Sequence, residues 1–360
     1  MSSQINKLLT WIRPDIQQMQ AYKVADATGL IKLDAMENPY PWPKQMTADW
    51  LKKMANVDIN RYPDPAAAEL VDKLRSTFNV GVEQSVVLGN GSDELIQLIL
   101  MSLNPGSLVL VPTPSFVMYK QISTSLGLSC DSIALNSDFS LNLPLMLEAI
   151  KERNPAVIFL AYPNNPTANL FDEGDIMAIV KATKGLVVID EAYQPFAGKT
   201  FLQTLSKNYP QLMVMRTVSK LGLAGLRLGY LVGDGELLEQ FEKVRLPYNI
   251  NAFTQLTAAF AFDYIDELDK QAQLICAQRE WLLRKLGTLS RLVVYPSDAN
   301  FILFSLTQSK AVAVFDALKS DGVLIKLMGQ AEGLPKECLR VTVGTPEQNT
   351  KFMTALANIL

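Results

Sequence analysis

The chain has 360 residues, 49% of them hydrophobic, and its net charge of −3 offers no basic surface of the kind that nucleic-acid binding needs. It contains no histidine, which excludes Ser-His-Asp and Cys-His catalysis and every His-ligated metal site. Without a secretion signal, a long apolar span or paired cysteines, the sequence predicts a cytoplasmic protein of about two domains that binds neither membrane nor nucleic acid.

From residue 85 onward, short apolar runs alternate with helical patterns. The runs lie at residues 86–89, 107–112, 156–163, 186–190, 212–219 and 226–233. Runs such as AVIFL and LVVI are continuously apolar, as expected of parallel strands that are covered on both faces. This alternation predicts an α/β domain built on a mostly parallel sheet.

The pattern changes after residue 251. Residues 252–289 predict long helices, and strand-like runs, a helix over 310–319 and a closing helix from about residue 346 follow. This order is α+β and indicates a second, smaller domain. The Pro-rich ENPYPWP (37–43) predicts a linker.

Three segments place polar residues where the predicted strands end. GNGSDELIQL (89–98) has Ser92 as a predicted N-cap, and it is either a capped helix or a phosphate site formed by backbone N–H groups. It matches neither a dinucleotide fingerprint nor a P-loop. AYPNNPTANL (161–170) is a loop, and Asp190 in LVVIDEAYQPF is either a cap or a site residue, at the edge where open α/β sheets bind ligands.

RTVSKLGLAGLRLGY (216–230) contains three cations and no carboxylate. Lys220 and Arg227 are either solvated charges on a glycine-rich loop or parts of a site. In the second interpretation, apolar surroundings and neighbouring cations lower the pKa of Lys220 and make it a nucleophile. Arg227 then binds a phosphate. Arg340 in CLRVTVGTP is either a surface residue or a carboxylate-binding residue.

Nine motifs occur in one order across residues 33–345: LDAMENPY, RYPDP, GNGSDE, PTPSFVMY, AYPNNPTAN, IDEAY, VSKLGLAGLRLGY, ANFIL and LRVTVGT. Together they resemble the fold-type I pyridoxal 5'-phosphate (PLP) aminotransferases and, within them, the histidinol-phosphate aminotransferases. The resemblance implies a large PLP-binding domain over residues 45–255 and a small C-terminal α+β domain over residues 256–360. It also implies an N-terminal segment, residues 1–44, that covers the active site and joins the small domain, and a homodimer with shared active sites.

The resemblance also implies roles for individual residues. Lys220 would form the Schiff base and carry the proton, and Asp190 would pair with the pyridinium nitrogen. The other implied cofactor contacts are Asn165 and Tyr193 to the 3'-oxygen, Phe116 stacked on the ring, Ser92, Asp93, Ser219 and Arg227 at the phosphate, and Tyr62 from the neighbouring subunit. The implied substrate contacts are Arg340 to an α-carboxylate, Tyr22 to the substrate phosphate, and Asn38.

The implied reaction is ping-pong transamination between L-histidinol phosphate and 2-oxoglutarate, a step of histidine biosynthesis. An aromatic or other amino-acid aminotransferase and a threonine-phosphate decarboxylase remain alternatives, although residues 22–43 favour the histidinol-phosphate enzymes. A PLP-binding regulator would need a DNA-binding module, for which the motifs leave no room. An inactive homologue is disfavoured because Lys220, Asp190, Asn165 and Arg227 are all present.

Two residues depart from the pattern or lack a role in it. Ala168 stands where the related motif PNNPTG has glycine, so a positive φ would strain it. The seven-residue spacing from Lys220 to Arg227, where some relatives have eight, is interpreted as subgroup variation. Arg216 receives no role from the resemblance and is interpreted as structural.

Overall fold

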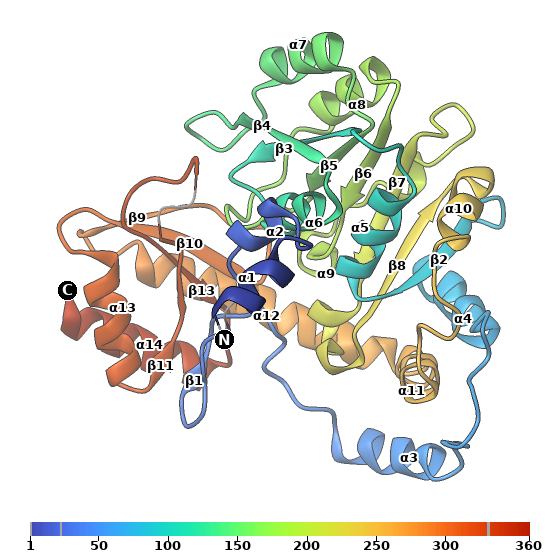
Figure 1. Cartoon of the computed structure of the whole chain (residues 1–360). Coiled ribbons are helices and arrows are strands. Elements are labelled where there is room, and N and C mark those ends of the chain that lie inside the picture. The colour runs from blue at the N-terminus through green and yellow to red at the C-terminus, as the bar shows by residue number, and fades with distance from the viewer. Residues whose placement is uncertain (1, 22–23, 330–331) are drawn as a thin grey trace.

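A seven-stranded sheet with the order β2-β8-β7-β6-β5-β3-β4 runs through the larger part of the chain (Figure 1). The computed structural model describes residues 2–21, 24–329 and 332–360. Only β8 (Leu228–Gly233) of this sheet runs opposite to the other six strands, which confirms the mostly parallel sheet. The other strands are β2 (Ser85–Asn90), β3 (Leu108–Thr113), β4 (Ser129–Ala134), β5 (Val157–Ala161), β6 (Leu186–Asp190) and β7 (Leu212–Thr217).

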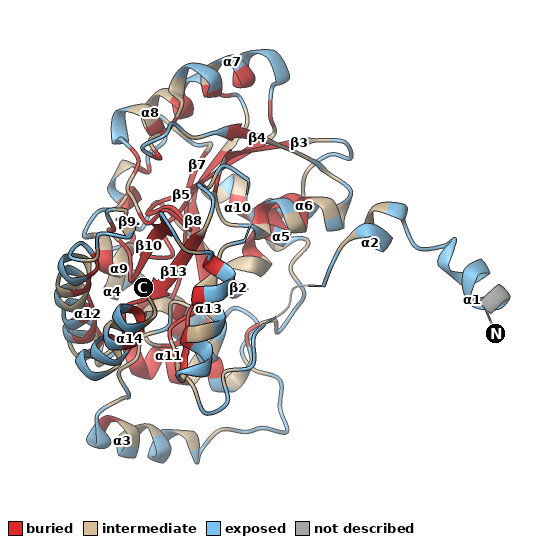
Figure 2. Ribbon diagram, turned by 90° about the vertical axis from the view of Figure 1, so that its left-hand side faces the viewer, coloured by how far each residue is buried: buried red, intermediate tan, exposed pale blue. Residues whose placement is uncertain are grey.

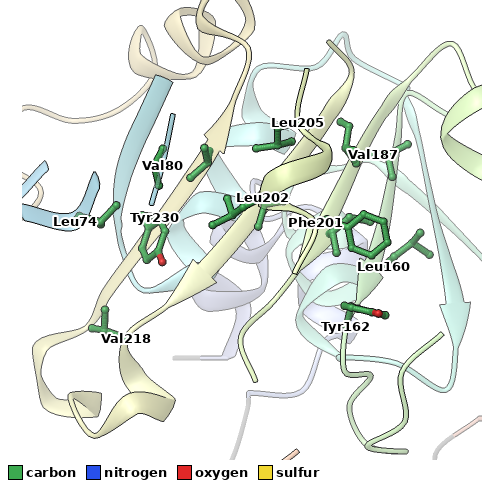
Figure 3. Close-up of a cluster of buried hydrophobic side chains, with 14 of the residues drawn as sticks. Leu74, Val80, Leu160, Tyr162, Val187, Phe201, Leu202, Leu205, Val218 and Tyr230 are labelled. Carbon is green, nitrogen blue, oxygen red and sulfur yellow. The ribbon is translucent and has the colours of Figure 1, made fainter. Parts of the chain in front are cut away.

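Helices cover both faces of this sheet, which explains the unbroken apolar runs. In β5, Val157 and Phe159 pack on one face, and Ile158 and Leu160 pack on the other, all fully buried. The first face is covered by α5 (Ser92–Met101), α6 (Met118–Leu126) and α10 (Gly235–Glu242). The second is covered by α4 (Ala68–Phe78), α7 (Leu143–Arg153), α8 (Glu173–Ala182) and α11 (Ala252–Phe262). Figure 3 shows Leu160, Tyr162 and Phe201 in the core on this second face.

A four-stranded antiparallel sheet, β12-β13-β10-β9, forms the core of the C-terminal part. Its strands are β9 (Leu292–Val294), β10 (Phe301–Leu306), β12 (Lys326–Leu327) and β13 (Cys338–Thr342). The helices α12 (Ile265–Leu286), α13 (Ala311–Ser320) and α14 (Pro346–Ile359) pack on it. The predicted α+β character of this part is therefore present, and the domain boundaries at residues 44 and 255 stay a prediction.

The N-terminal segment contacts both parts of the molecule. Strand β1 (Ile31–Lys32) pairs with β11 (Val323–Leu324), beside the small sheet. Helices α1 (Ser2–Leu9) and α2 (Pro14–Gln18) extend away from the body (Figure 2). Arg13 ties α2 to the end of α6, because its Nη2 donates to the carbonyl oxygens of Thr124 at 2.9 Å and Ser125 at 2.7 Å. The predicted linker at residues 37–43 is neither helix nor strand and leads into α3 (Lys44–Met54).

One strand of the large sheet was missing from the sequence prediction, whereas the helices after residue 251 were predicted. Strand β4 was not predicted, because it is an edge strand with the mixed sequence SCDSIA and a partly exposed pattern. The helices predicted over 252–289 are present as α11, which ends at Phe262, and α12, which begins at Ile265. None of the helices in the described part of the chain is long and apolar enough to cross a bilayer.

Candidate active site

A cavity of about 110 Å³ lies where β5, β6 and β7 end and α5 begins. The predicted cofactor contacts line it, with the exception of Tyr62. The lining residues are Met36, Ser92, Asp93, Phe116, Ala161, Asn165, Asp190, Ala192, Tyr193, Thr217, Ser219, Lys220 and Arg227. The carboxyl ends of parallel strands meet at one edge of the sheet, so residues far apart in sequence come together here.

Lys220 lies in a short 3₁₀ turn, η2 (Ser219–Leu221), directly after β7. Its Nζ donates to the carbonyl oxygen of Ala35 at 3.1 Å and lies 5.9 Å from the centre of the Tyr193 ring. Burial, followed by the positive charges of Arg340 and Arg227, lowers the pKa of Lys220 to about 8. A large fraction of this amine is therefore neutral and nucleophilic slightly above neutral pH.

Asp190, the last residue of β6, presents a buried carboxylate to the cavity. Tyr119 donates its hydroxyl to Asp190 Oδ2 at 2.7 Å, and the backbone N–H of Ala192 donates to Oδ1 at 3.1 Å. Burial raises the pKa of Asp190 to about 6, against the opposing effect of these two hydrogen bonds. Asp190 is therefore mainly ionised at pH 7.

A hydrogen-bonded chain connects the large sheet to the small one across the cavity. Asn165 Nδ2 donates to the Tyr193 hydroxyl at 3.1 Å, and Arg340 Nη1 donates to Asn165 Oδ1 at 2.6 Å. Arg340 Nη2 also donates to the carbonyl oxygen of Asp34 at 3.0 Å, so the N-terminal segment helps to hold this guanidinium. The site is thus assembled from both parts of the chain.

Glycines bring backbone close to the start of α5, where an anion site was predicted. A Cβ on Gly91, which has φ 79°, would lie 2.6 Å from Arg227 Nη2, and a Cβ on Gly229 would lie 2.8 Å from the Ser92 nitrogen. Gly91 is the N-cap, so the prediction that Ser92 caps this helix is wrong: Ser92 is the first helical residue, and no side chain caps α5. The positive φ of Gly91 favours glycine at the cap position.

A second, larger cavity of about 380 Å³ adjoins the first. Both are lined by Met36, Phe116 and Asn165, and Arg340 lines the larger one. Its remaining walls are mainly apolar, formed by residues such as Val111, Pro114 and Leu327. Its charged lining residues are Lys120, Lys326, Glu332 and Arg340, and Lys326 and Arg340 are directly opposite each other on β12 and β13.

Two of the predicted contacts, Tyr62 and Asn38, are not brought to these cavities. Tyr62 is 81% exposed and stacks on Tyr248, with ring centres 4.5 Å apart. Asn38 lies behind the Lys220 turn, where its Nδ2 donates to Gln271 Oε1 at 2.9 Å and its Oδ1 accepts from the backbone N–H of Tyr40. Tyr22 lies outside the described residues.

Sequence reasoning missed several residues that shape the site. Tyr119 lies in PTPSFVMY on the first turn of α6, three residues after Phe116, and this spacing was the available signal. Met36, with φ 55°, lines both cavities. Ala168 does adopt φ 65°, so the expected strained conformation is present in the loop after β5.

The site combines three chemical functions within one cavity. It has a partly neutral amine at Lys220, a buried carboxylate at Asp190, and a corner where the N-terminus of α5 and Arg227 could hold an anion. This set suits a ligand that carries a carbonyl group, a basic nitrogen and a phosphate. Within the described ranges, no cluster of three or more cysteine, aspartate or glutamate side chains is arranged to hold a metal ion.

This combination of fold and site is that of a transferase acting on amino groups. Residues 28–356 match the aminotransferase class I and II family, and the chain belongs to that family. It is 53% identical over 352 residues to histidinol-phosphate aminotransferase 2 of Nitrosococcus oceani, covering 98% of both chains. It is 47% identical over 347 residues to histidinol-phosphate aminotransferase 1 of Burkholderia lata, covering 96% of both.

The fold is also shared with solved structures. The crystal structure of histidinol-phosphate aminotransferase from Sinorhizobium meliloti in complex with pyridoxal-5'-phosphate matches with a TM-score of 0.85, covering 96% of both chains. The sequences are 22% identical, and the structural match shows that the two proteins share a fold. The fold-type I architecture predicted from the motifs is therefore confirmed.

Proposed function

We propose that this aminotransferase uses pyridoxal 5'-phosphate to transfer the amino group of L-histidinol phosphate to 2-oxoglutarate, giving imidazole-acetol phosphate and L-glutamate. In histidine biosynthesis, this reversible reaction runs in the opposite direction and forms L-histidinol phosphate. The observation that carries the proposal is the larger cavity beside Lys220, whose apolar walls suit a planar ring and whose cations Lys120, Lys326 and Arg340 suit phosphate and carboxylate groups. Identity of 53% to a histidinol-phosphate aminotransferase supports the same substrate.

The residues of the smaller cavity fit the cofactor. Gly91 and Gly229 leave a corner at the N-terminus of α5 that side chains would fill, and this corner suits the phosphate, with Ser92, Asp93, Ser219 and Arg227 around it. Asp190 would face the ring nitrogen, Phe116 would stack on the ring, and Asn165 and Tyr193 would hold the 3'-oxygen. When bound, the cofactor supplies a reactive carbonyl and a ring that withdraws electrons from the substrate.

The protein's own groups would then hold the substrate and move its proton. Lys220 Nζ, with its lowered pKa, takes the proton from the substrate Cα as a general base. Asp190, ionised above about pH 6, holds a positive charge on the ring nitrogen. Arg340 binds the α-carboxylate of glutamate by two parallel hydrogen bonds, and the two substrates use the site in turn.

The proposal includes a homodimer in which Tyr62 reaches the phosphate corner of the neighbouring subunit. Tyr62 supports this reading because it is exposed on its own subunit and backed by the ring of Tyr248. Mixing a Lys220→Ala variant with a Tyr62→Ala variant tests it. A heterodimer contains one site with both residues intact, so the mixture should exceed the summed activities of the separate variants. Activity equal to that sum would exclude a shared site.

Substrate assays on the purified protein test the reaction itself. Three reactions are compared: L-histidinol phosphate with 2-oxoglutarate, phenylalanine with 2-oxoglutarate, and threonine phosphate alone. We expect glutamate formation to be fastest with histidinol phosphate. Release of CO2 from threonine phosphate without a keto acid, together with no turnover of histidinol phosphate, would identify a decarboxylase instead.

The assignment of Lys220 has its own test. The loaded enzyme should show a visible absorbance band that borohydride abolishes, and Lys220→Ala should lack both the band and the activity. Lys184→Ala, which removes an exposed lysine, is the matched control and should keep both. A borohydride-sensitive band in the Lys220→Ala variant would refute the assignment.

A further inference from the structure

Tyr119 is a fully buried tyrosine that the proposed mechanism does not use. It lies on the first turn of α6, and its ring stacks on Phe159 with centres 4.8 Å apart and planes 10° from parallel. Phe116, the residue proposed to stack on the cofactor, makes a T-shaped contact with the same ring, with centres 5.5 Å apart and planes at 87°. These two contacts fix the ring and direct its hydroxyl to Asp190 Oδ2 at 2.7 Å.

The bond from Tyr119 determines how Asp190 is held. Oδ1 accepts the backbone N–H of Ala192, and Oδ2 accepts the phenol, so each carboxylate oxygen has a donor inside the protein. A hydrogen bond to an ionised acceptor is stronger than a neutral one, and it stabilises the charged form of the acid. Burial and the adjacent Asp190 raise the pKa of Tyr119 well above its usual range, so the phenol keeps its proton and remains the donor.

We propose that Tyr119 is the positioning residue of Asp190: its hydroxyl keeps the carboxylate ionised and aimed into the cavity, so that Asp190 can hold a proton on the nitrogen of a bound pyridine ring. This inference rests on the proposed use of pyridoxal 5'-phosphate. It assigns Tyr119 no contact with cofactor or substrate. Its effect passes through Asp190 alone.

The charges around Asp190 show why such a donor matters. Burial disfavours the carboxylate, and the nearby acids Asp93 and Glu191 disfavour it further. Tyr119 and the Ala192 N–H act in the opposite direction. The other titratable groups that line this cavity are Tyr193, Lys220 and Arg227. Removing the Tyr119 hydroxyl therefore raises the pKa of Asp190 toward neutrality.

The test measures the titration of Asp190 in the cofactor-free, full-length protein. Isotope-edited infrared spectroscopy of protein labelled with 13C-aspartate follows the protonated carboxyl band, and an Asp190→Asn variant identifies the band of interest. Tyr119→Phe keeps the ring and removes the hydroxyl, so we expect the titration midpoint to rise by about 1 to 2 pH units. Tyr162→Phe removes another buried hydroxyl, one that contacts Glu173, and should leave the midpoint unchanged.

A second variant covers the case in which Tyr119→Phe does not fold. Replacing Tyr119 by 3-fluorotyrosine makes the phenol a stronger donor with little change in shape, and it should lower the Asp190 midpoint. A purely structural Tyr119 would move neither midpoint, and unchanged midpoints in both variants would overturn the proposal. Cofactor affinity provides a second readout: Tyr119→Phe should weaken binding of pyridoxal 5'-phosphate about tenfold, while Tyr162→Phe should not.

These measurements use no substrate. Failure of the histidinol-phosphate assay would therefore refute the proposed substrate without affecting the Asp190 titration. If pyridoxal 5'-phosphate bound equally well to wild type and Tyr119→Phe although the midpoint rose, the link from Asp190 to cofactor binding would be refuted.

Discussion

Arg216 Nη2 lies 2.7 Å from Glu191 Oε2, and both side chains are buried. Arg216 also donates to Thr200 Oγ1 at 2.7 Å, and its guanidinium lies 6.0 Å from the Phe78 ring centre. The acid missing from residues 216–230 is thus supplied by the residue that follows Asp190. The pair connects the end of β7 to the end of β6. It therefore holds together the two strand ends next to which Lys220 and Asp190 lie.

Breaking this pair should destabilise the protein strongly. Arg216→Met leaves Glu191 buried without its cation, and such changes cost about 3–5 kcal/mol of unfolding free energy. Arg153→Met is the matched control, because its bond to Asp131 is half-exposed and contributes about 0–1 kcal/mol. Urea unfolding of the cofactor-free variants measures both. Equal losses of unfolding free energy in the two variants would show that the buried Arg216 pair stabilises the protein no more than an exposed pair.

The lowered pKa of Lys220 predicts how cofactor uptake depends on pH. Below pH 8 the amine is increasingly protonated and cannot attack a carbonyl, and above pH 8 it is mainly neutral. The rate at which the cofactor-free protein takes up pyridoxal 5'-phosphate should therefore rise with pH to a midpoint near 8, whereas an ordinary lysine would titrate near 10.5. Stopped-flow absorbance measures this rate.

Removal of the nearby cation Arg340 provides the control for the predicted pH midpoint of Lys220. Burial is the main cause of the lowered pKa, and the charge of Arg340 is the next. Arg340→Gln should therefore move the midpoint upward while leaving it below 10.5. A midpoint that did not change would mean that Arg340 does not act on the Lys220 charge.

Arg340 also predicts a difference between the two half-reactions. Glutamate has an α-carboxylate for the guanidinium to bind, whereas L-histidinol phosphate has none. Arg340→Gln should lower kcat/KM for glutamate about 10²- to 10³-fold, as expected when one partner of a buried charge pair is lost, and lower it less for histidinol phosphate. Single-turnover kinetics with each substrate separates the two. An equal loss in both would indicate that Arg340 acts by holding Asn165, to which it donates at 2.6 Å.

The hydrophobic pattern of short stretches of sequence predicted the central strands and the polar residues at their ends. Strands β5, β6 and β7 begin with apolar residues that are buried on both faces, and the polar residues at or after their ends, Asn165, Asp190 and Lys220, identified the edge of the sheet that carries the site. Edge strand β4 gave no such signal, because its sequence SCDSIA is mixed and only one of its residues is buried.

The missed contacts depend on tertiary packing. The Tyr119–Asp190 bond joins residues 71 positions apart, and the Arg216–Glu191 bond joins residues 25 apart. No periodicity in the sequence connects such pairs. The N-cap of α5 was also missed for a conformational reason: Ser92 is a better capping residue by type, but the residue at the cap position has φ 79°, which favours glycine.

Because the alanine in the loop after β5 is strained, we expect its replacement by glycine to change the unfolding free energy unusually little. Ala168 is buried with φ 65°, a conformation that costs a residue with a Cβ about 1–2 kcal/mol. Ala168→Gly relieves that cost but loses a buried methyl, about 0.8 kcal/mol, and gains unfolded-chain entropy worth about 0.4–1 kcal/mol. These effects nearly cancel, so its unfolding free energy should stay within about 1 kcal/mol of wild type.

Ala258→Gly is the matched control, since Ala258 is equally buried but lies within α11. There the lost methyl and the lower helix propensity of glycine add, so we expect a loss of about 2 kcal/mol in the same urea titration. If Ala168→Gly were as destabilising as Ala258→Gly, the left-handed alanine would carry no strain. The loop would then tolerate alanine because the methyl packs well, and the glycine of PNNPTG would have no conformational advantage at this position.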